Sequence, residues 1–185
     1  MRRLARVIAA LALLALIGTG AALWLRPPVP VVPPEGTEDP LTGPLTGPVD
    51  LILIEKSARR LTLIRDGQPV RRYDVALGFA PEGDKDRQGD GRTPEGRFTI
   101  DRRNDGSAFH LSLGLDYPQP EDRKRARAGG YDPGGDIMIH GQPNELPDGI
   151  RLPGDWTAGC IALTDAEIRE IWSVAPLGTV VEIRP

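Results

Sequence analysis

The sequence is poor in cysteine and histidine, with one Cys and two His among 185 residues. A single cysteine cannot form a disulfide within the chain, so no internal disulfide framework supports the fold. The candidate zinc ligands are His110, His140 and Cys160, whose separations of 30 and 20 residues match no compact zinc-binding pattern. We therefore expect no metal site and no cofactor.

An excess of positive charge is also missing. The chain has 23 Lys and Arg against 26 Asp and Glu, which gives a formal net charge of -3. Because nucleic-acid-binding domains present a strongly basic surface, we expect no nucleic-acid partner. The chain contains no G-x-S-x-G motif of a serine hydrolase. Its short, acidic Gly89-Asp90-Gly91 stretch is not a phosphate-binding glycine loop.

The N-terminus contains the longest hydrophobic run. Arg2, Arg3 and Arg6 precede residues 7–25, which hold neither a charge nor a proline. As a helix this run would span roughly 28 Å, close to the hydrocarbon thickness of a bilayer. We favour a transmembrane anchor within residues 1–25, oriented N-in by the positive-inside rule, over a cleaved signal peptide. Either alternative exports the rest of the protein, and the anchor would make the membrane a partner.

Residues 26–48 form a Pro-rich linker. Eight prolines occur in these 23 residues, including a short repeat, LTGPLTGP, over residues 41–48. Such a segment favours polyproline II and acts as a semi-rigid spacer. We expect it to separate the folded domain from the membrane.

Residues 49–185 show the pattern of one mostly-β domain. Apolar and β-branched residues occur in short runs bounded by turn residues. Asp66-Gly67 predicts a hairpin turn between two of these runs. The expected strands are Val49–Glu55, Arg60–Arg65, Val70–Leu77, Arg97–Asp101, Phe109–Leu115, Asp136–His140 and Thr179–Ile183.

One C-terminal helix has clear start and stop signals. Thr164 and Glu167 form a capping-box pattern, and the apolar residues that follow have helical spacing. Pro176 and Gly178 then end the helix. The charged residues 121–127 indicate a second, solvated helical face, whereas residues 84–92 are polar and glycine-bearing and predict a mobile loop.

Cys160 is the first candidate for chemistry. An isolated cysteine is more often a small buried apolar residue than a nucleophile. Its setting favours the second possibility, because Gly159 allows close backbone approach and Ile161 begins an apolar run. The thiol would then lie at a turn or strand start, where backbone N–H groups converge as an oxyanion hole requires.

A cysteine nucleophile needs a base, and there are two candidates. His140 ends an apolar strand and is followed by Gly141, which places its ring at the end of the strand. His110 precedes an apolar strand segment, and a structural role suits it better. We expect His140 to be the base.

Three segments together resemble the L,D-transpeptidase (YkuD) catalytic domain family. Residues 91–98 (GRTPEGRF) are similar to a strand start of the family, residues 139–141 (IHG) to its His-Gly pair, and residues 157–161 (TAGCI) to its [S/T]-H-G-C segment. Fifteen residues separate the second segment from the third, which fits the family's spacing. The resemblance covers about residues 49–183.

The resemblance implies a β-sandwich-like domain and a peptidoglycan L,D-transpeptidase. In such an enzyme Cys160 would attack the carbonyl of the diamino acid in a stem peptide, D-Ala would leave, and an amine would resolve the thioester. His140 would be the base, with its N–H bound by the Gly141 carbonyl. The N–H groups of Gly159 and Cys160 would form the oxyanion hole. The domain would then work in the periplasm or cell-wall space.

The sequence departs from the family pattern at two positions. Ala158 replaces the histidine of the [S/T]-H-G-C segment, and Ala162 stands where the family often has an arginine. Trp156, Thr157 and His110 are therefore candidate substrate-binding residues. Two alternatives to transfer stay open: a cysteine hydrolase that cleaves at the same diamino acid, and a non-catalytic wall-binding module.

Overall fold

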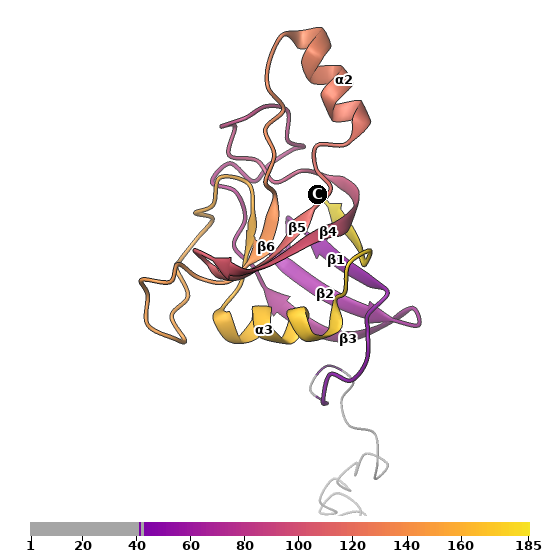
Figure 1. Ribbon diagram of the computed structural model, residues 1–185, viewed down its shortest axis with the longest axis vertical. Coiled ribbons are helices and arrows are strands. Elements are labelled where there is room, and N and C mark those ends of the chain that lie inside the picture. Colours follow the sequence, from indigo (N-terminus) through magenta and orange to yellow (C-terminus); the bar gives the residue numbers. More distant parts are fainter. Residues whose placement is uncertain (1–40, 42) are drawn as a thin grey trace, which may run out of the picture. The chain divides into compact units, whose positions relative to one another are not determined.

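The computed structural model describes residue 41 and residues 43–185 (Figure 1). The expected anchor or signal helix, residues 1–25, and most of the Pro-rich linker lie outside these residues. Among the helices that the structure does describe, none is long and apolar enough to cross a membrane.

The described domain is mostly β, as the sequence predicts. A single sheet of eight strands has the order β3-β2-β1-β8-β4-β5-β6-β7. In chain order the elements are β1 (Leu51–Glu55), β2 (Arg60–Arg65), β3 (Gln68–Asp74), β4 (Gly96–Ser107), β5 (His110–Leu115), α2 (Pro120–Gly129), β6 (Met138–His140), β7 (Ile161–Ala162), α3 (Asp165–Val174) and β8 (Val180–Arg184).

The first two strands follow directly from local sequence, whereas β3 begins at Gln68 and ends at Asp74, three residues before the expected end. β1 alternates partly buried and buried residues, with Ile52 and Ile54 fully inside. Asp66 and Gly67 have φ of 51° and 72° and connect β2 to β3, as a two-residue hairpin turn with positive φ requires. The sequence also misses some boundaries: Asp136 has a φ of 53°, so β6 is shorter than expected and begins at Met138.

The long strand β4 makes the sheet continuous. Its residues 96–99 pair with β8, and its residues 100–107 pair with β5. A sandwich-like arrangement was expected from the family resemblance. The eight strands instead form one continuous hydrogen-bonded sheet, because β4 pairs with β8 along its first part and with β5 along the rest.

The two outer strands of this order are brought together by the chain that follows β3. Ala76 donates its N–H to the Ala162 carbonyl at 3.0 Å and accepts the Ala162 N–H at 2.8 Å. Gly78 forms a second bridge, to Thr157. The sheet therefore curls until the chain after β3 meets β7, next to Cys160.

The two helices have different relations to the core. In α3, Ile168, Ile171 and Val174 are buried, and the helix lies against β5 and β6 (Figure 1). The expected Thr164–Glu167 capping box is present. In α2 only Ala126 is buried, which confirms the solvated helical face expected near residues 121–127.

Candidate active site

A cavity of about 500 Å³ contains most of the residues singled out from the sequence. Cys160, His140, Trp156 and Thr157 all line it, although they come from separate segments of the chain. The complete lining set is Asn104, Ser107, Ala108, Phe109, Ser112, Asp136, Met138, His140, Trp156, Thr157, Ala158 and Cys160.

Cys160 is held at the end of a tight loop that leads into β7. Thr157 Oγ1 donates to the Cys160 carbonyl at 2.7 Å and accepts the Gly159 N–H at 3.1 Å. Gly159 has a φ of 138°, and a Cβ there would lie 2.7 Å from the Arg92 carbonyl oxygen. Glycine is therefore required at 159, both for its conformation and for the close approach to Arg92.

The same hydrogen bond affects the expected oxyanion hole. Because the Gly159 N–H already donates to Thr157 Oγ1, it is not available to a substrate in this conformation. Thr157 thus shapes the loop that carries the thiol, and the Cys160 N–H becomes the stronger candidate donor.

The Cys160 thiol lies between two backbone groups of the neighbouring segment. Its Sγ accepts the Met138 N–H and donates to the Asp136 carbonyl, each at 3.4 Å. Burial raises the pKa of the Cys160 thiol above its ordinary value, although the Met138 hydrogen bond opposes this shift. The free thiol is therefore neutral at neutral pH.

His140 is buried, with a defined tautomer. Its Nδ1 lies 2.7 Å from the Gly141 carbonyl oxygen. Since a carbonyl only accepts hydrogen bonds, Nδ1 carries the proton and Nε2 is free to accept one. Burial lowers the pKa of the His140 imidazole, so the ring is neutral as well.

Two aromatic side chains pack around the imidazole. The centroids of the Phe109 and Trp156 rings lie 4.6 Å and 5.8 Å from that of His140. The Trp156 indole N–H is buried and has no hydrogen-bond partner among the described residues. These contacts fix the plane of His140 and make the cavity wall apolar around it.

The backbone after His140 is held by the start of α3. Asp165 Oδ1 accepts the Gln142 N–H at 2.8 Å, and a Cβ on Gly141 would lie 2.5 Å from the same oxygen. The Gly141 N–H donates to the carbonyls of Phe109 and Leu111. Sequence reasoning missed Asp165, because an acidic residue in the first turn of a helix has an ordinary explanation there.

His110 lies apart from the cavity. It does not belong to the lining set, and its Nε2 faces Arg169 Nη1 of α3 at 3.0 Å. Its backbone N–H donates to Asn144 Oδ1, and its φ is 65°. The structure therefore brings together Cys160, His140, Trp156 and Thr157 but leaves His110 outside.

The cavity contains a thiol and an acceptor nitrogen without a hydrogen bond between them. Within the described residues, the hydrogen bonds of Cys160 Sγ go to backbone groups of Asp136 and Met138. A neutral imidazole with a free Nε2 can nevertheless accept the thiol proton as the sulfur attacks a substrate. The arrangement is chemically suited to acyl transfer through a thioester.

A second cavity of about 460 Å³ adjoins the first. Asp136 and Ala158 line both cavities, so Ala158 stands at their boundary, where the family has histidine. Asp90 anchors the loop beside the second cavity by accepting N–H groups of Asp86, Arg87 and Arg92. Burial raises the Asp90 pKa, but hydrogen bonds from Lys85 and these backbone groups outweigh it and lower the pKa to about 2.

Comparison with known protein families gives one match over the described domain. The family described as YkuD, L,D-transpeptidase catalytic domain, matches residues 49–183. A comparison with curated proteins gave no match.

Solved structures of similar fold come from several bacteria. The helical cell shape determining protein Pgp2 from Campylobacter jejuni is 28% identical, with a TM-score of 0.58 over 74% of this chain and 47% of that chain. Bd1075 from Bdellovibrio bacteriovorus is 22% identical, with a TM-score of 0.53 over 75% of this chain and 48% of that chain. An L,D-transpeptidase from Xylanimonas cellulosilytica is 18% identical, with a TM-score of 0.50 over 76% and 63%. The chain thus spans about half the length of the first two proteins.

Proposed function

The chain belongs to the L,D-transpeptidase (YkuD) catalytic domain family, and on this basis we propose that it acts on peptidoglycan stem peptides through a thioester on Cys160. One observation supports this mechanism above others. Cys160 lines the same cavity as His140, whose Nδ1 is bound to the Gly141 carbonyl and whose Nε2 can therefore accept a proton.

The first half-reaction forms the thioester. As Cys160 Sγ attacks the carbonyl carbon of the diamino acid, its proton passes to His140 Nε2. The C–N bond to D-Ala then breaks, and the imidazolium returns the proton to the departing amine. Because both groups begin neutral, the proton moves during attack rather than before it.

The oxyanion formed in this step needs donors fixed in advance. The Cys160 N–H lies at the attacking residue, whereas the Gly159 N–H is bound to Thr157 Oγ1. We assign the Cys160 N–H as the first donor. A second donor would become available if Thr157 Oγ1 released Gly159 on substrate binding.

The second half-reaction depends on what attacks the thioester. An amine of a neighbouring stem would give a cross-link, and water would give a shortened stem. Ala158 removes the polar side chain that the family places at the boundary of the two cavities, and this observation favours hydrolysis as the second candidate. Either reaction requires the domain to work outside the cytoplasm, in the periplasm or cell-wall space.

Intact mass spectrometry and muropeptide assays test the proposal together. The protein is incubated with a carbapenem and, separately, with purified tetrapeptide muropeptides. We expect a covalent adduct on Cys160 and release of D-Ala, both lost in Cys160→Ala. Ser173→Ala, an exposed change on α3, is the matched control and should behave as wild type.

The products distinguish the candidate functions. Dimers indicate transfer, and tripeptides alone indicate hydrolysis. A Cys160→Ala protein with undiminished D-Ala release would overturn the cysteine mechanism. Wild-type protein that forms no adduct and releases no D-Ala, yet binds sacculi, would indicate a non-catalytic wall-binding module.

A further inference from the structure

Arg102 stands in the same cross-strand row of the sheet as the candidate nucleophile. In the strand register Arg102 pairs with Gly114, and Gly114 pairs with Met138. Beyond β6, Ile139 pairs with Ile161 of β7, and Cys160, the residue before Ile161, accepts the Met138 N–H with its Sγ. The adjacent cross-strand row on the same face of the sheet consists of Asn104, Ser112 and His140, and all three residues line the cavity. Arg102, two residues before Asn104 on β4, therefore lies on the cavity face of the sheet, next to the cavity lining.

The Arg102 side chain extends across this face toward Cys160. Its stem lies directly over Gly114, where an added Cβ would be 2.3 Å from Arg102 Cγ. Its guanidinium Nη2 reaches Asp136 Oδ1 at 2.9 Å and Met138 Sδ at 3.9 Å. Gly114 leaves the space for this path, since any side chain at that position would block it.

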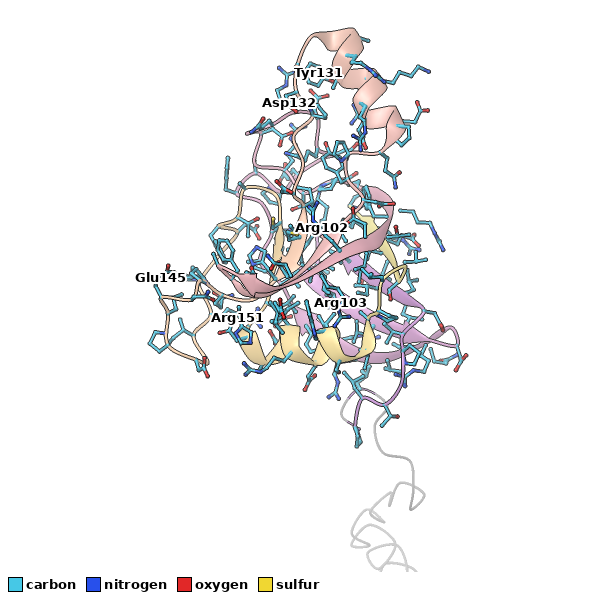
Figure 2. The ribbon with its side chains drawn as sticks, viewed as in Figure 1. Arg102, Arg103, Tyr131, Asp132, Glu145 and Arg151 are labelled. Atoms are coloured by element: carbon cyan, nitrogen blue, oxygen red, sulfur yellow. The ribbon has the colours of Figure 1, made fainter. Side chains whose placement is uncertain are left out.

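The neighbouring residue, Arg103, has a different role. Its Nη1 and Nη2 donate to the carbonyls of Ala175 and Trp172 at 2.8 Å and 2.9 Å, and its guanidinium lies 3.9 Å from the Trp172 ring centroid. Figure 2 labels the two arginines, with Arg103 beside α3 and Arg102 farther from that helix. Arg103 therefore holds β4 against α3, whereas Arg102 contacts Asp136 and Met138, which line the cavity.

The ion pair that holds Arg102 is weak enough to exchange. The Asp136 side chain is 86% exposed and that of Arg102 is 43% exposed. Exposed pairs of this kind contribute little free energy. A bound carboxylate in a partly desolvated cavity could therefore replace Asp136 as the partner of the guanidinium.

Among the described residues, no cation lines the cavity itself. Its lining set contains neither Lys nor Arg. Lys85, beside the second cavity, is 3% exposed and already bound to Asp90 at 2.7 Å and to the Arg87 carbonyl. Position 162, where the family often has an arginine, is a fully buried Ala162.

We propose that Arg102 binds the terminal carboxylate of the D-Ala residue that leaves the donor stem peptide. This assignment rests on the function proposed above. The carboxylate lies two bonds beyond the nitrogen of the bond to be broken. Asp136 contacts both the candidate nucleophile and Arg102: its carbonyl oxygen lies 3.4 Å from Cys160 Sγ, and its side chain binds the Arg102 guanidinium. On binding, the substrate carboxylate takes the place of the Asp136 carboxylate.

Two further features agree with this assignment. Burial raises the Cys160 pKa, and Arg102 is near enough to the thiol for its positive charge to lower that pKa, by less than Lys85 does. A planar guanidinium also fits the two oxygens of a carboxylate, which a lysine at the same place would not match.

Binding to an inactive protein tests the proposal independently of catalysis. In a Cys160→Ala background, isothermal titration calorimetry compares a stem tetrapeptide ending in D-Ala with the same peptide as a C-terminal amide. We expect the carboxylate form to bind about 10- to 100-fold more tightly, the range for a hydrogen bond to a charged group. Arg102→Gln should remove this difference, and Arg102→Lys should restore only part of it.

Arg97→Gln is the matched control. Arg97 lies on the same strand, is 68% exposed and faces Glu182 at 3.8 Å, outside the cavity lining. The control should keep the full preference for the carboxylate form. The proposal is overturned if Arg102→Gln keeps that preference, or if the protein with Arg102 binds the two peptides equally or binds neither. A carboxylate preference in binding, together with wild-type protein that releases no D-Ala, would instead count against the cysteine mechanism alone.

Discussion

Cys160 and His140 share a cavity whose apolar walls favour the neutral form of each. Burial raises the pKa of the thiol and lowers that of the imidazole. The ordinary thiol pKa of about 8.5 thus moves further above neutral pH, and the ordinary imidazole pKa of about 6.5 moves further below it. The resting site is then a thiol and an imidazole, not a preformed thiolate–imidazolium pair.

This electrostatic setting predicts slow alkylation of the free thiol at neutral pH. Only the thiolate reacts, so the iodoacetamide rate should rise with pH and continue rising above about pH 8.5. The charges near the sulfur, Asp136, Lys85 and Arg102, shift the pKa less than burial does. Alkylation is quenched at timed intervals at each pH, and intact mass spectrometry then gives the dependence of the alkylation rate on pH.

The same protein in urea serves as the control. Unfolding exposes Cys160, so its alkylation should then follow the lower, ordinary thiol pKa. A folded protein whose alkylation rate is already at its plateau near pH 7 would contradict a neutral resting thiol.

At the scale of elements, one buried lysine connects β1 to the loop that leads into β4. Lys56 is 2% exposed, and its Nζ binds Glu95 at 2.8 Å and the carbonyls of Gly83 and Thr93. The loop runs on to Arg92, whose carbonyl packs against Gly159 next to Cys160. Lys56 therefore supports the loop behind the candidate nucleophile.

Replacing Lys56 with methionine should be costly. The change leaves Glu95 and two carbonyls without their cation, and breaking a buried pair typically costs about 3 kcal/mol or more. Urea unfolding followed by circular dichroism measures the free energy of unfolding.

Lys124→Met provides the comparison, because Lys124 is exposed on α2. It should change the free energy of unfolding by less than about 0.5 kcal/mol. Equal effects of the two substitutions would show that Lys56 does not anchor the loop.

For the domain as a whole, the decisive feature is the curl that brings the chain after β3 beside β7. Besides Ala76, this segment contributes the Phe79 N–H, which donates to the Thr157 carbonyl at 2.9 Å. Gly78 lies between two backbones, where an added Cβ would be 2.1 Å from the Gly91 carbonyl oxygen. The chain after β3 and the loop that carries Cys160 therefore pack against each other as one unit.

Gly78→Ala tests this coupling. The backbone at Gly91 would have to move, so we expect a loss of about 2 to 3 kcal/mol in stability and a fall in D-Ala release. Gly106→Ala on β4 is the control, because its nearest heavy atom would be 3.6 Å from the new Cβ. Denaturant unfolding and D-Ala release are measured for both. A Gly78→Ala protein as stable and active as Gly106→Ala would contradict the coupling.

Local sequence by itself determined much of this protein. Asp66-Gly67 predicted the hairpin because a two-residue turn needs positive φ, and Thr164 with Glu167 predicted the start of α3 because both groups satisfy backbone N–H donors nearby. The segment 91–98, the pair His140-Gly141 and the motif around Cys160 together indicated the family, since each of them lies within a short stretch of sequence.

Only the tertiary structure decided which residues surround those groups. Phe109, Asp165 and Arg102 lie 31, 25 and 38 residues from His140 in the sequence. They reach the site through cross-strand register, the continuous β4 strand and the curl of the sheet. Such contacts depend on which strands become neighbours, and no local pattern specifies that. For the same reason His110 resembled a site residue in the sequence, yet the fold turned it toward Arg169 and away from the cavity.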